Sequence, residues 1–165
     1  MEPRLRPAAR ALVVDDSGRV LLCRFTFDKP EGPLEVWATP GGGVEPDESP
    51  LEALRRELDE EIGLRITGDD PPHVWHQVVV AEGHAKGYDG VINDFFLVRT
   101  GPFEPRGSMT DAELAAENVT GFRWWTPEEL DGYEGPAVFA PRALSAGLAA
   151  LLAGGAPRQP IPMGL

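Results

Sequence analysis

The sequence predicts a single α/β domain, and three observations support this. The chain has 165 residues, of which 42% are hydrophobic, which suits one compact core and is too little for two ordinary domains. Runs of β-branched and apolar residues, typical of strands, recur along most of the chain. One helix beginning near residue 50 has unusually clear boundary signals. No internal repeat is visible.

The segments before this helix are predicted to be extended. Residues 9–14 and 20–25 are apolar runs separated by a turn at 15–18, which predicts a hairpin. Residues 26–34 are rich in proline, glycine and charge and are predicted to be a loop. Residues 36–39 then form a short extended lead into three consecutive glycines.

The helix that follows is defined at both ends. Ser49 is a good N-cap, Pro50 sits where a missing N–H is harmless, and Glu52 completes an S-x-x-E capping box. Gly63 can adopt the left-handed conformation that ends a helix. Four aliphatic residues recur every three or four positions and form one inward stripe: Leu51, Leu54, Leu58 and Ile62.

The second half of the chain continues the alternation of strands and short helices. The expected elements are strands at 74–81 and 91–98, a helical turn at 111–116, a strand at 121–125, and helices at 126–130 and 141–152. The glycine-rich loop at 82–90 is too long for a tight turn, and such loops often carry specificity. We assign residues 1–153 to the domain and 154–165 to a proline-rich C-terminal tail.

Composition restricts the partners. Lys and Arg number 15 against 27 Asp and Glu, and the net charge of −12 argues against non-specific binding to nucleic acid or to anionic membranes. An anionic substrate would need a metal or a local basic group to offset this field. The single cysteine, Cys23, cannot form an internal disulfide and is expected to be an inert core residue. Without a long apolar segment, we expect a cytoplasmic protein.

The helix crowds three carboxylates onto one side. Glu57, Glu60 and Glu61 fall within an arc of roughly 100° beside the aliphatic stripe. Such a group is costly unless a hard cation such as Mg²⁺ or Mn²⁺ neutralises it, and carboxylates are ligands that these ions prefer. Magnesium usually takes phosphate oxygens as further ligands, so a phosphate ester or anhydride is the expected substrate. The preceding glycines would let the loop lie close to this face.

These residues form a longer pattern. Gly42, then Glu48, then RELDEEIGL at 56–64 match every defined position of the Nudix box, G-x5-E-x7-R-E-U-x-E-E-x-G-U, where U is a bulky aliphatic residue. The sequence resembles the Nudix hydrolases, and WATPGG at 37–42 and FRWWTPEEL at 122–130 resemble neighbouring family segments. The resemblance covers residues 8–152 and implies a mixed β-sheet sandwiched between helices. It also implies hydrolysis of a nucleoside diphosphate linked to another moiety.

The resemblance also implies roles for individual residues. Glu57, Glu60 and Glu61 match the residues that bind divalent metals in this family. Gly42, Glu48 and Arg56 match residues that shape the box and steady those ligands.

The general base differs among family members. We favour Glu61 or Glu60 as a metal ligand with base character. Glu117 is the second choice, and Glu113 matches less well, as residues of the segment before the late strand.

Several other residues have two interpretations each. Arg24 on the second strand and Lys86 in the glycine-rich loop could bind a substrate phosphate, or equally could form surface ion pairs. The tryptophans could stack on a nucleobase, but a core position is favoured for Trp37, Trp75, Trp124 and Trp125. The histidines could suggest zinc, but their spacing fits no common zinc motif, and surface or hydrogen-bonding roles are favoured for His73, His76 and His84.

The substrate within the family stays open. The motif of the NADH-cleaving members, the coenzyme A signature, and the proline or tyrosine that flags ADP-ribose or dinucleoside polyphosphate members are all missing at their usual positions. A nucleoside triphosphate is slightly favoured over a nucleoside diphosphate derivative such as ADP-ribose or a nucleotide sugar. A catalytically silent ligand sensor and an isomerase of the same fold are the alternatives, although Cys23 lies in the wrong context for the isomerase. The apolar C-terminal helix and the tail could support a homodimer.

Overall fold

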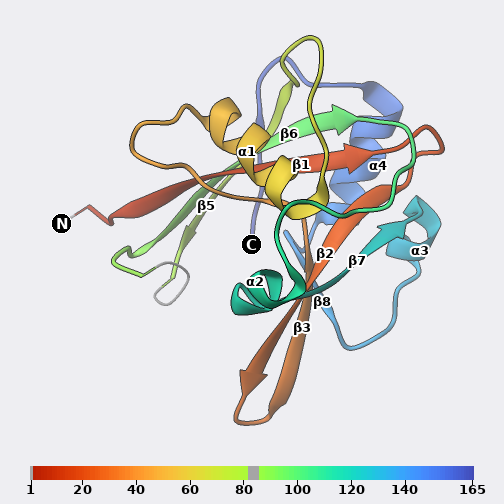
Figure 1. Ribbon diagram of the computed structural model, residues 1–165. Helices are drawn as coiled ribbons and strands as arrows, with labels where there is room; N and C mark the ends of the chain where they lie inside the picture. Colours follow the sequence, from red (N-terminus) through yellow and green to blue (C-terminus); the bar gives the residue numbers. More distant parts are fainter. Residues whose placement is uncertain (1, 82–85) are drawn as a thin grey trace.

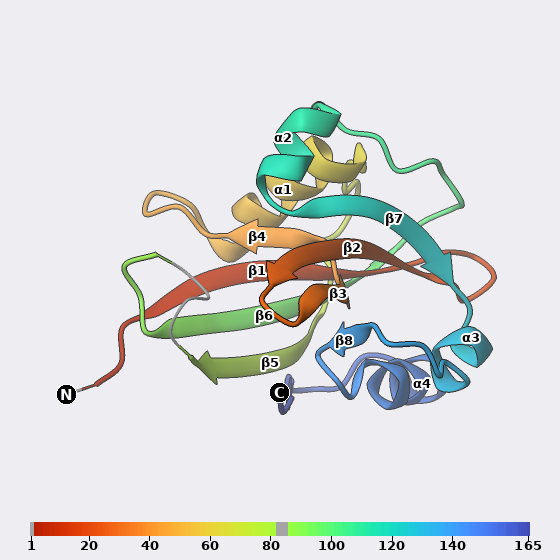
Figure 2. The same cartoon turned by 90° about the horizontal axis from the view of Figure 1, so that it is seen from below.

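The computed structural model describes residues 2–81 and 86–165, which form one sheet with helices on both faces (Figure 1). The helices are α1 (Pro50–Ile62), α2 (Asp111–Ala116), α3 (Pro127–Asp131) and α4 (Leu144–Gly154). Figure 2 shows α1 and α2 on one side of the sheet and α3 and α4 on the other. The predicted mixed sheet between helices is therefore confirmed. No helix in the described ranges has both the length and the apolarity needed to cross a membrane.

The sheet mixes parallel and antiparallel pairs. Its strands are β1 (Leu5–Val14), β2 (Val20–Lys29), β3 (Gly32–Ala38), β4 (Gly41–Gly43), β5 (His73–Val80), β6 (Gly90–Arg99), β7 (Val119–Trp125), β8 (Val138–Ala140) and β9 (Ile161–Pro162). The order is β8-β3-β2-β1-β6-β5-β9, with β4 paired to β1 and β7 to β2. The pairs β1–β6, β3–β8 and β5–β9 are parallel. The central strand, β1, therefore contacts the box through β4.

Side chains of β1 alternate between two core layers. Leu12 and Val14 pack in the layer that contains Leu148 of α4. Ala11 and Val13 pack in the layer with Leu54, Leu58 and Ile62 of α1. This alternation follows from the strand period of two, and it explains why nearly every side chain of residues 8–14 is buried.

The capping signals of α1 are confirmed. The side chain of Ser49 accepts a hydrogen bond from the Glu52 N–H at 3.2 Å, and Glu52 accepts one from the Ser49 N–H at 3.0 Å. Gly63 ends the helix with φ of 72°, and a Cβ there would collide with the carbonyl oxygen of Arg106. Glycine is therefore required by both conformation and space.

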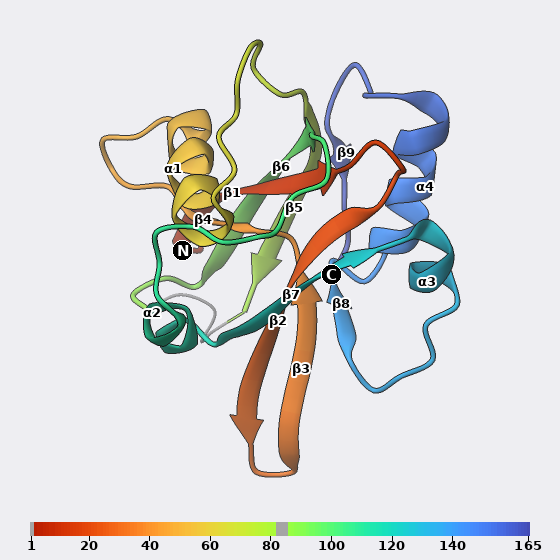
Figure 3. The same ribbon diagram turned by 45° about the vertical axis from the view of Figure 1, so that its right-hand side comes forward.

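The loop predicted at residues 26–34 is wrong. These residues extend β2 and β3 into a hairpin that projects from the body of the protein (Figure 3), with Thr26 opposite Glu35 and Asp28 opposite Pro33. Pro33 lies outside the part of β3 that pairs with β8, so its missing N–H interrupts no ladder on that side. Proline and charge signalled a loop, but here they mark the solvated end of a two-stranded ribbon.

Two features near the C-terminus also depart from expectation. Helix α4 begins at Leu144, three residues beyond the predicted residue 141, because residues 141–144 form a turn closed by the Leu144 N–H on the Pro141 carbonyl. Part of the tail is a strand, since Ile161 and Pro162 pair with β5. The carbonyl of Gly164 also accepts a hydrogen bond from Gln77.

Candidate active site

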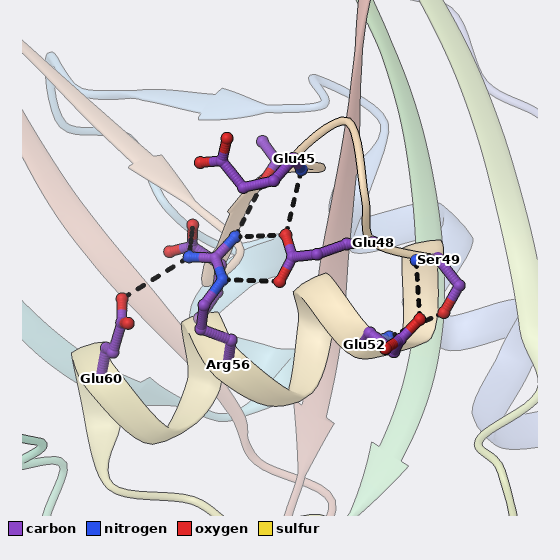
Figure 4. Close-up of polar contacts among 8 residues, drawn as sticks. Glu45, Glu48, Ser49, Glu52, Arg56 and Glu60 are labelled. Carbon is purple, nitrogen blue, oxygen red and sulfur yellow. Dashed lines mark hydrogen bonds and ion pairs between the residues drawn. The ribbon is translucent and has the colours of Figure 1, made fainter.

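A two-pronged ion pair joins the box loop to α1. Nε and Nη2 of Arg56 each donate to a carboxylate oxygen of Glu48 at 2.8 Å, as Figure 4 shows. The Glu48 carboxylate also accepts the Glu45 N–H at 3.0 Å, and Arg56 reaches the Gly43 carbonyl at 3.2 Å. The hydrogen bond with Arg56 lowers the pKa of Glu48 to about 2. This pair holds the loop and the helix in one register.

Arg56 also reaches two of the box glutamates. Its Nη1 donates to Oε1 of Glu57 at 3.0 Å and lies 3.6 Å from Oε2 of Glu60. The side chain of Glu60 is 42% exposed, whereas that of Glu57 is 15% exposed. One guanidinium therefore holds two of the three carboxylates beside each other.

The third box glutamate is buried. Glu61 is 3% exposed. Its pKa is raised to about 9, mainly because the carboxyl group is buried and secondly because the Glu57 carboxyl group adjoins it. Without a cation, the Glu61 carboxyl group is therefore protonated at neutral pH. The convergence expected from helix geometry is thus strongest for Glu57 and Glu61.

The glycines before α1 allow this close approach. A Cβ at Gly42 would lie 2.6 Å from the Glu57 carboxylate, so any other residue would displace that side chain. Gly41 has φ of 138°, a conformation that residues with a side chain rarely adopt. Because β4 pairs with β1, these glycines lie at a fixed place against the sheet.

Glu117 approaches the box from another element. It is the C-cap residue of α2. Its pKa is raised, mainly by burial and secondly by repulsion from the charges of Glu57 and Glu60. Asn118, in the left-handed region with φ of 65°, makes the turn into β7. Glu113 instead caps its own helix, where its carboxylate accepts the Thr110 N–H at 3.0 Å. Of the two candidates in this segment, Glu117 is the one whose charge interacts with the box.

A cavity of about 400 Å³ opens beside Glu61, between the α1 C-terminus, α2 and β7. Its lining includes the apolar side chains of Met109, Leu114 and Phe122, the hydroxyl-bearing Thr120, and the ion pair of Arg106 with Asp111. This volume is within the range of small-ligand sites. An apolar wall next to a carboxylate cluster suits a ligand with one flat apolar part and one anionic part.

The two basic residues considered for substrate binding lie in different places. Arg24 donates from Nε to Oγ1 of Thr120 at 3.1 Å and from Nη2 to its carbonyl at 2.9 Å. It thus lies on β2 next to a residue of the cavity wall. Lys86 is exposed in the β5–β6 loop, and no described contact connects it with the box. Their substrate roles stay predictions.

The core assignments are largely confirmed. Trp37, Trp75 and Trp125 are buried, whereas Trp124 is half-buried and donates to the Phe103 carbonyl at 3.1 Å. Cys23 is fully buried, and burial raises the pKa of its thiol.

Sequence reasoning missed basic residues near the box, among them Arg10 on the central strand. Arg10, within the first apolar run, donates to the Thr39 carbonyl at 3.3 Å, and its charge interacts favourably with Glu61. An arginine between Ala9 and Ala11 in an otherwise buried strand was the available signal.

Sequence reasoning also missed the contact of two histidines with one aspartate. His73 and His76 both lie against Asp94, with His76 Nδ1 at 2.7 Å from the carboxylate. Hydrogen-bonding contact was the favoured role for these two residues, but their meeting on one carboxylate was not foreseen. His84 lies outside the described residues.

The described residues thus form a mixed sheet between helices, with a capped helix that presents clustered glutamates beside a cavity. The family model of the NUDIX domain matches residues 4–144, and the chain belongs to the Nudix family. It is thus a Nudix hydrolase, and enzymes of this family act on small nucleotide substrates and generally use divalent metals.

Individual relatives agree with this assignment. Nucleoside triphosphatase NudI of Escherichia coli O81 (strain ED1a) is 30% identical over 123 residues, covering 74% of this chain and 83% of that protein. NudI of Salmonella newport (strain SL254) is 32% identical over 123 residues, which again cover 74% of this chain and 83% of that protein. The MutT NUDIX hydrolase from Burkholderia pseudomallei has a TM-score of 0.58 at 25% identity, covering 88% of this chain and 97% of that one. The E. coli ORF135 protein, at 24% identity and a TM-score of 0.63 over 91% and 92%, supports the fold.

Proposed function

We propose that this enzyme hydrolyses a nucleoside triphosphate to the monophosphate and pyrophosphate with Mg²⁺, for which Mn²⁺ could substitute. The observation that carries the proposal is the burial of Glu61 against Glu57 at the edge of the cavity. Triphosphate as the substrate is supported by relatives named nucleoside triphosphatase. A nucleoside diphosphate derivative, such as ADP-ribose or a nucleotide sugar, is the second candidate.

The donor set fits a hard divalent cation. Glu57, Glu60 and Glu61 offer only oxygen, and the raised pKa of Glu61 marks a place where positive charge is needed. These three residues would hold the ion. When bound, it would supply Lewis-acid polarisation of phosphate oxygens and make an attacking water more acidic.

The protein side chains would do the rest. Gly42, Glu48 and Arg56 fix the position of the carboxylates through the contacts described above. In the reaction, water adds to one phosphorus of the α–β anhydride and the bridging oxygen leaves with the bond electrons, as part of pyrophosphate after attack at the α-phosphorus or as part of the monophosphate after attack at the β-phosphorus. A carboxylate takes the proton of the water. Glu61 or Glu60 is our choice for that carboxylate.

Other groups complete the model of binding. Glu117 is the alternative base, because it approaches Glu57 and Glu60 from α2. The apolar wall of the cavity would hold the nucleobase. Arg24, beside Thr120, would offset part of the substrate charge, and Lys86 is a second candidate for this role.

The test is chromatographic product analysis with a panel of nucleoside triphosphates, oxidised nucleotides, ADP-ribose, nucleotide sugars and dinucleoside polyphosphates. Each compound is incubated with Mg²⁺ and with chelator. Release of monophosphate and pyrophosphate from a triphosphate, only with Mg²⁺, is the expected result. Turnover restricted to diphosphate derivatives would replace the substrate proposed. No turnover of any compound with Mg²⁺ or Mn²⁺ would favour a silent ligand sensor.

Three further expectations stay predictions. The cytoplasmic location and the homodimer rest on sequence alone. The same holds for the division into a domain at 1–153 and a tail at 154–165, and the pairing of β9 with β5 attaches part of that tail to the domain.

A further inference from the structure

A β-bulge brings two histidines onto one face of the sheet. His73 is opposite Phe96 and His76 is opposite Asp94, so β5 has one more residue in this interval than β6 has. In a regular strand, residues three apart point to opposite faces. The irregularity between His73 and Trp75 removes this difference, and both imidazoles meet the same carboxylate.

The three side chains present converging ligand atoms. Oδ1 of Asp94 is 2.7 Å from Nδ1 of His76 and 3.0 Å from Nε2 of His73. The ligand atoms all lie within 4.8 Å of one another. Tetrahedral zinc with bonds of roughly 2.0–2.1 Å separates its ligands by about 3.4 Å. To admit the ion, the carboxylate oxygen would move about 0.4–0.7 Å away from the two nitrogens, now 3.0 and 2.7 Å from it, and the nitrogens would approach each other by up to about 1.4 Å.

One of these atoms lacks a partner. Nε2 of His73 is shielded from solvent and, despite its closeness to Asp94, makes no hydrogen bond within the described part of the chain. Its ring is held in place by stacking on Phe96, with centroids 5.0 Å apart. A buried nitrogen without a partner costs free energy that a bound cation would recover. Other atoms of these side chains face solvent, since His73, His76 and Asp94 are 35%, 43% and 22% exposed.

We propose that His73, His76 and Asp94 form a second metal site, which binds Zn²⁺ through two imidazoles and one carboxylate. Imidazole nitrogens suit zinc, whereas Mg²⁺ prefers all-oxygen sites such as the box. Three protein ligands leave one position open for water or an external ligand. The site is separate from the box, because Gly42, Ala9, Asp94 and His76 are successive neighbours across four strands. The two strand spacings from Gly42 to Asp94 amount to roughly 10 Å, and the three to His76 to roughly 14 Å.

The experiment titrates the full chain with Zn²⁺ against a chromophoric chelator, with Mg²⁺ saturating so that the box is occupied. We expect one Zn²⁺ per chain, bound at least about tenfold more weakly by His76→Gln and Asp94→Asn, because even outer-shell changes cost that much. Glu61→Gln is the control and should bind Zn²⁺ as the unaltered chain does. Equal binding by all variants, or loss only in the control, would overturn the site.

A second measurement needs no substitution. Imidazole ¹⁵N spectra of the unaltered protein with Zn²⁺ should show coordination through Nε2 of His73 and Nδ1 of His76, the nitrogens that face Asp94. Coordination by other nitrogens, or no shift at either ring, would contradict the proposal even if a variant failed to fold.

Discussion

Two clusters of candidate metal ligands lie on the α1 side of the sheet, and they differ in almost every respect that matters to a metal. The box cluster offers oxygen alone, contains a carboxyl group that is 3% exposed, and is held by Arg56. The histidine cluster offers two nitrogens and one oxygen, is partly exposed, and has no comparable cation among the described residues. The first is arranged for a hard ion and the second for a borderline one.

The difference teaches how local backbone geometry selects chemistry. In the box, a glycine without Cβ and a regular helix bring like charges together. In the histidine cluster, an irregular strand brings together residues that regular geometry would separate. The predictions below test whether the two clusters act independently, beginning with the largest expected effect.

Glu61→Gln should lower turnover of the preferred nucleotide by a factor on the order of 10²–10³, as removal of one preorganised electrostatic group does. The substitution keeps the shape of the side chain but removes its charge from the box. Initial rates with Mg²⁺ measure the effect, with circular dichroism to check the fold. A fully active variant would refute the proposed site.

Two control variants define this comparison. Glu52→Gln removes the same charge from the same helix, and because glutamine can complete a capping box, it should leave turnover within about twofold. His76→Gln should also leave Mg²⁺-dependent turnover within about twofold. A large loss in His76→Gln would mean that the two clusters are coupled.

Gly42→Ala should reduce turnover by about tenfold with little change in thermal stability. The new Cβ would lie 2.6 Å from the Glu57 carboxylate, a flexible group that can move away and so lose its position rather than break the fold. Steady-state kinetics and a melting curve measure both quantities. Gly154→Ala, where an added Cβ meets nothing within 4 Å, is the control and should change neither.

The box could be predicted from sequence because its signals are local. Ser49, Glu52 and Gly63 fix the ends of α1, and the helical period then places the glutamates. The histidine cluster could not be predicted, since a bulge between His73 and Trp75 depends on pairing with a strand about 20 residues away. The prediction of a loop at residues 26–34 failed for the opposite reason. The local proline and charge signals were strong, but the pairing of β2 with β3 overrides them. The approach of Glu117 to Glu57 is likewise a long-range result.

Glu61→Gln should also stabilise the metal-free protein at alkaline pH. The pKa of Glu61 is raised to about 9 from an ordinary value of 4.5, so the folded state holds a proton that the unfolded state releases between these values. The protonation of Glu61 therefore contributes its full stabilisation of the folded state below pH 4.5, and this contribution is lost as the pH rises towards 9. Glutamine keeps a neutral group there, and Tm in chelator should rise by a few degrees at pH 8 and by nothing at pH 4.5. A variant with lower Tm at pH 8 would contradict the raised pKa of Glu61.

The smallest effect concerns the ion pair that holds the box loop. The hydrogen bond with Arg56 lowers the pKa of Glu48 from 4.5 to about 2, so this carboxylate contributes stability above pH 4.5 that is lost as pH falls towards 2. Glu48→Gln should lower Tm by about 2 °C at pH 7, because water still screens the pair, and by less as the pH approaches 2. Glu45→Gln makes the same charge change three residues away and should leave Tm unchanged. If Glu48→Gln lowered Tm equally at pH 7 and near pH 2, the glutamate would stabilise the loop through packing. The ion pair with Arg56 would then no longer distinguish the box from the histidine cluster.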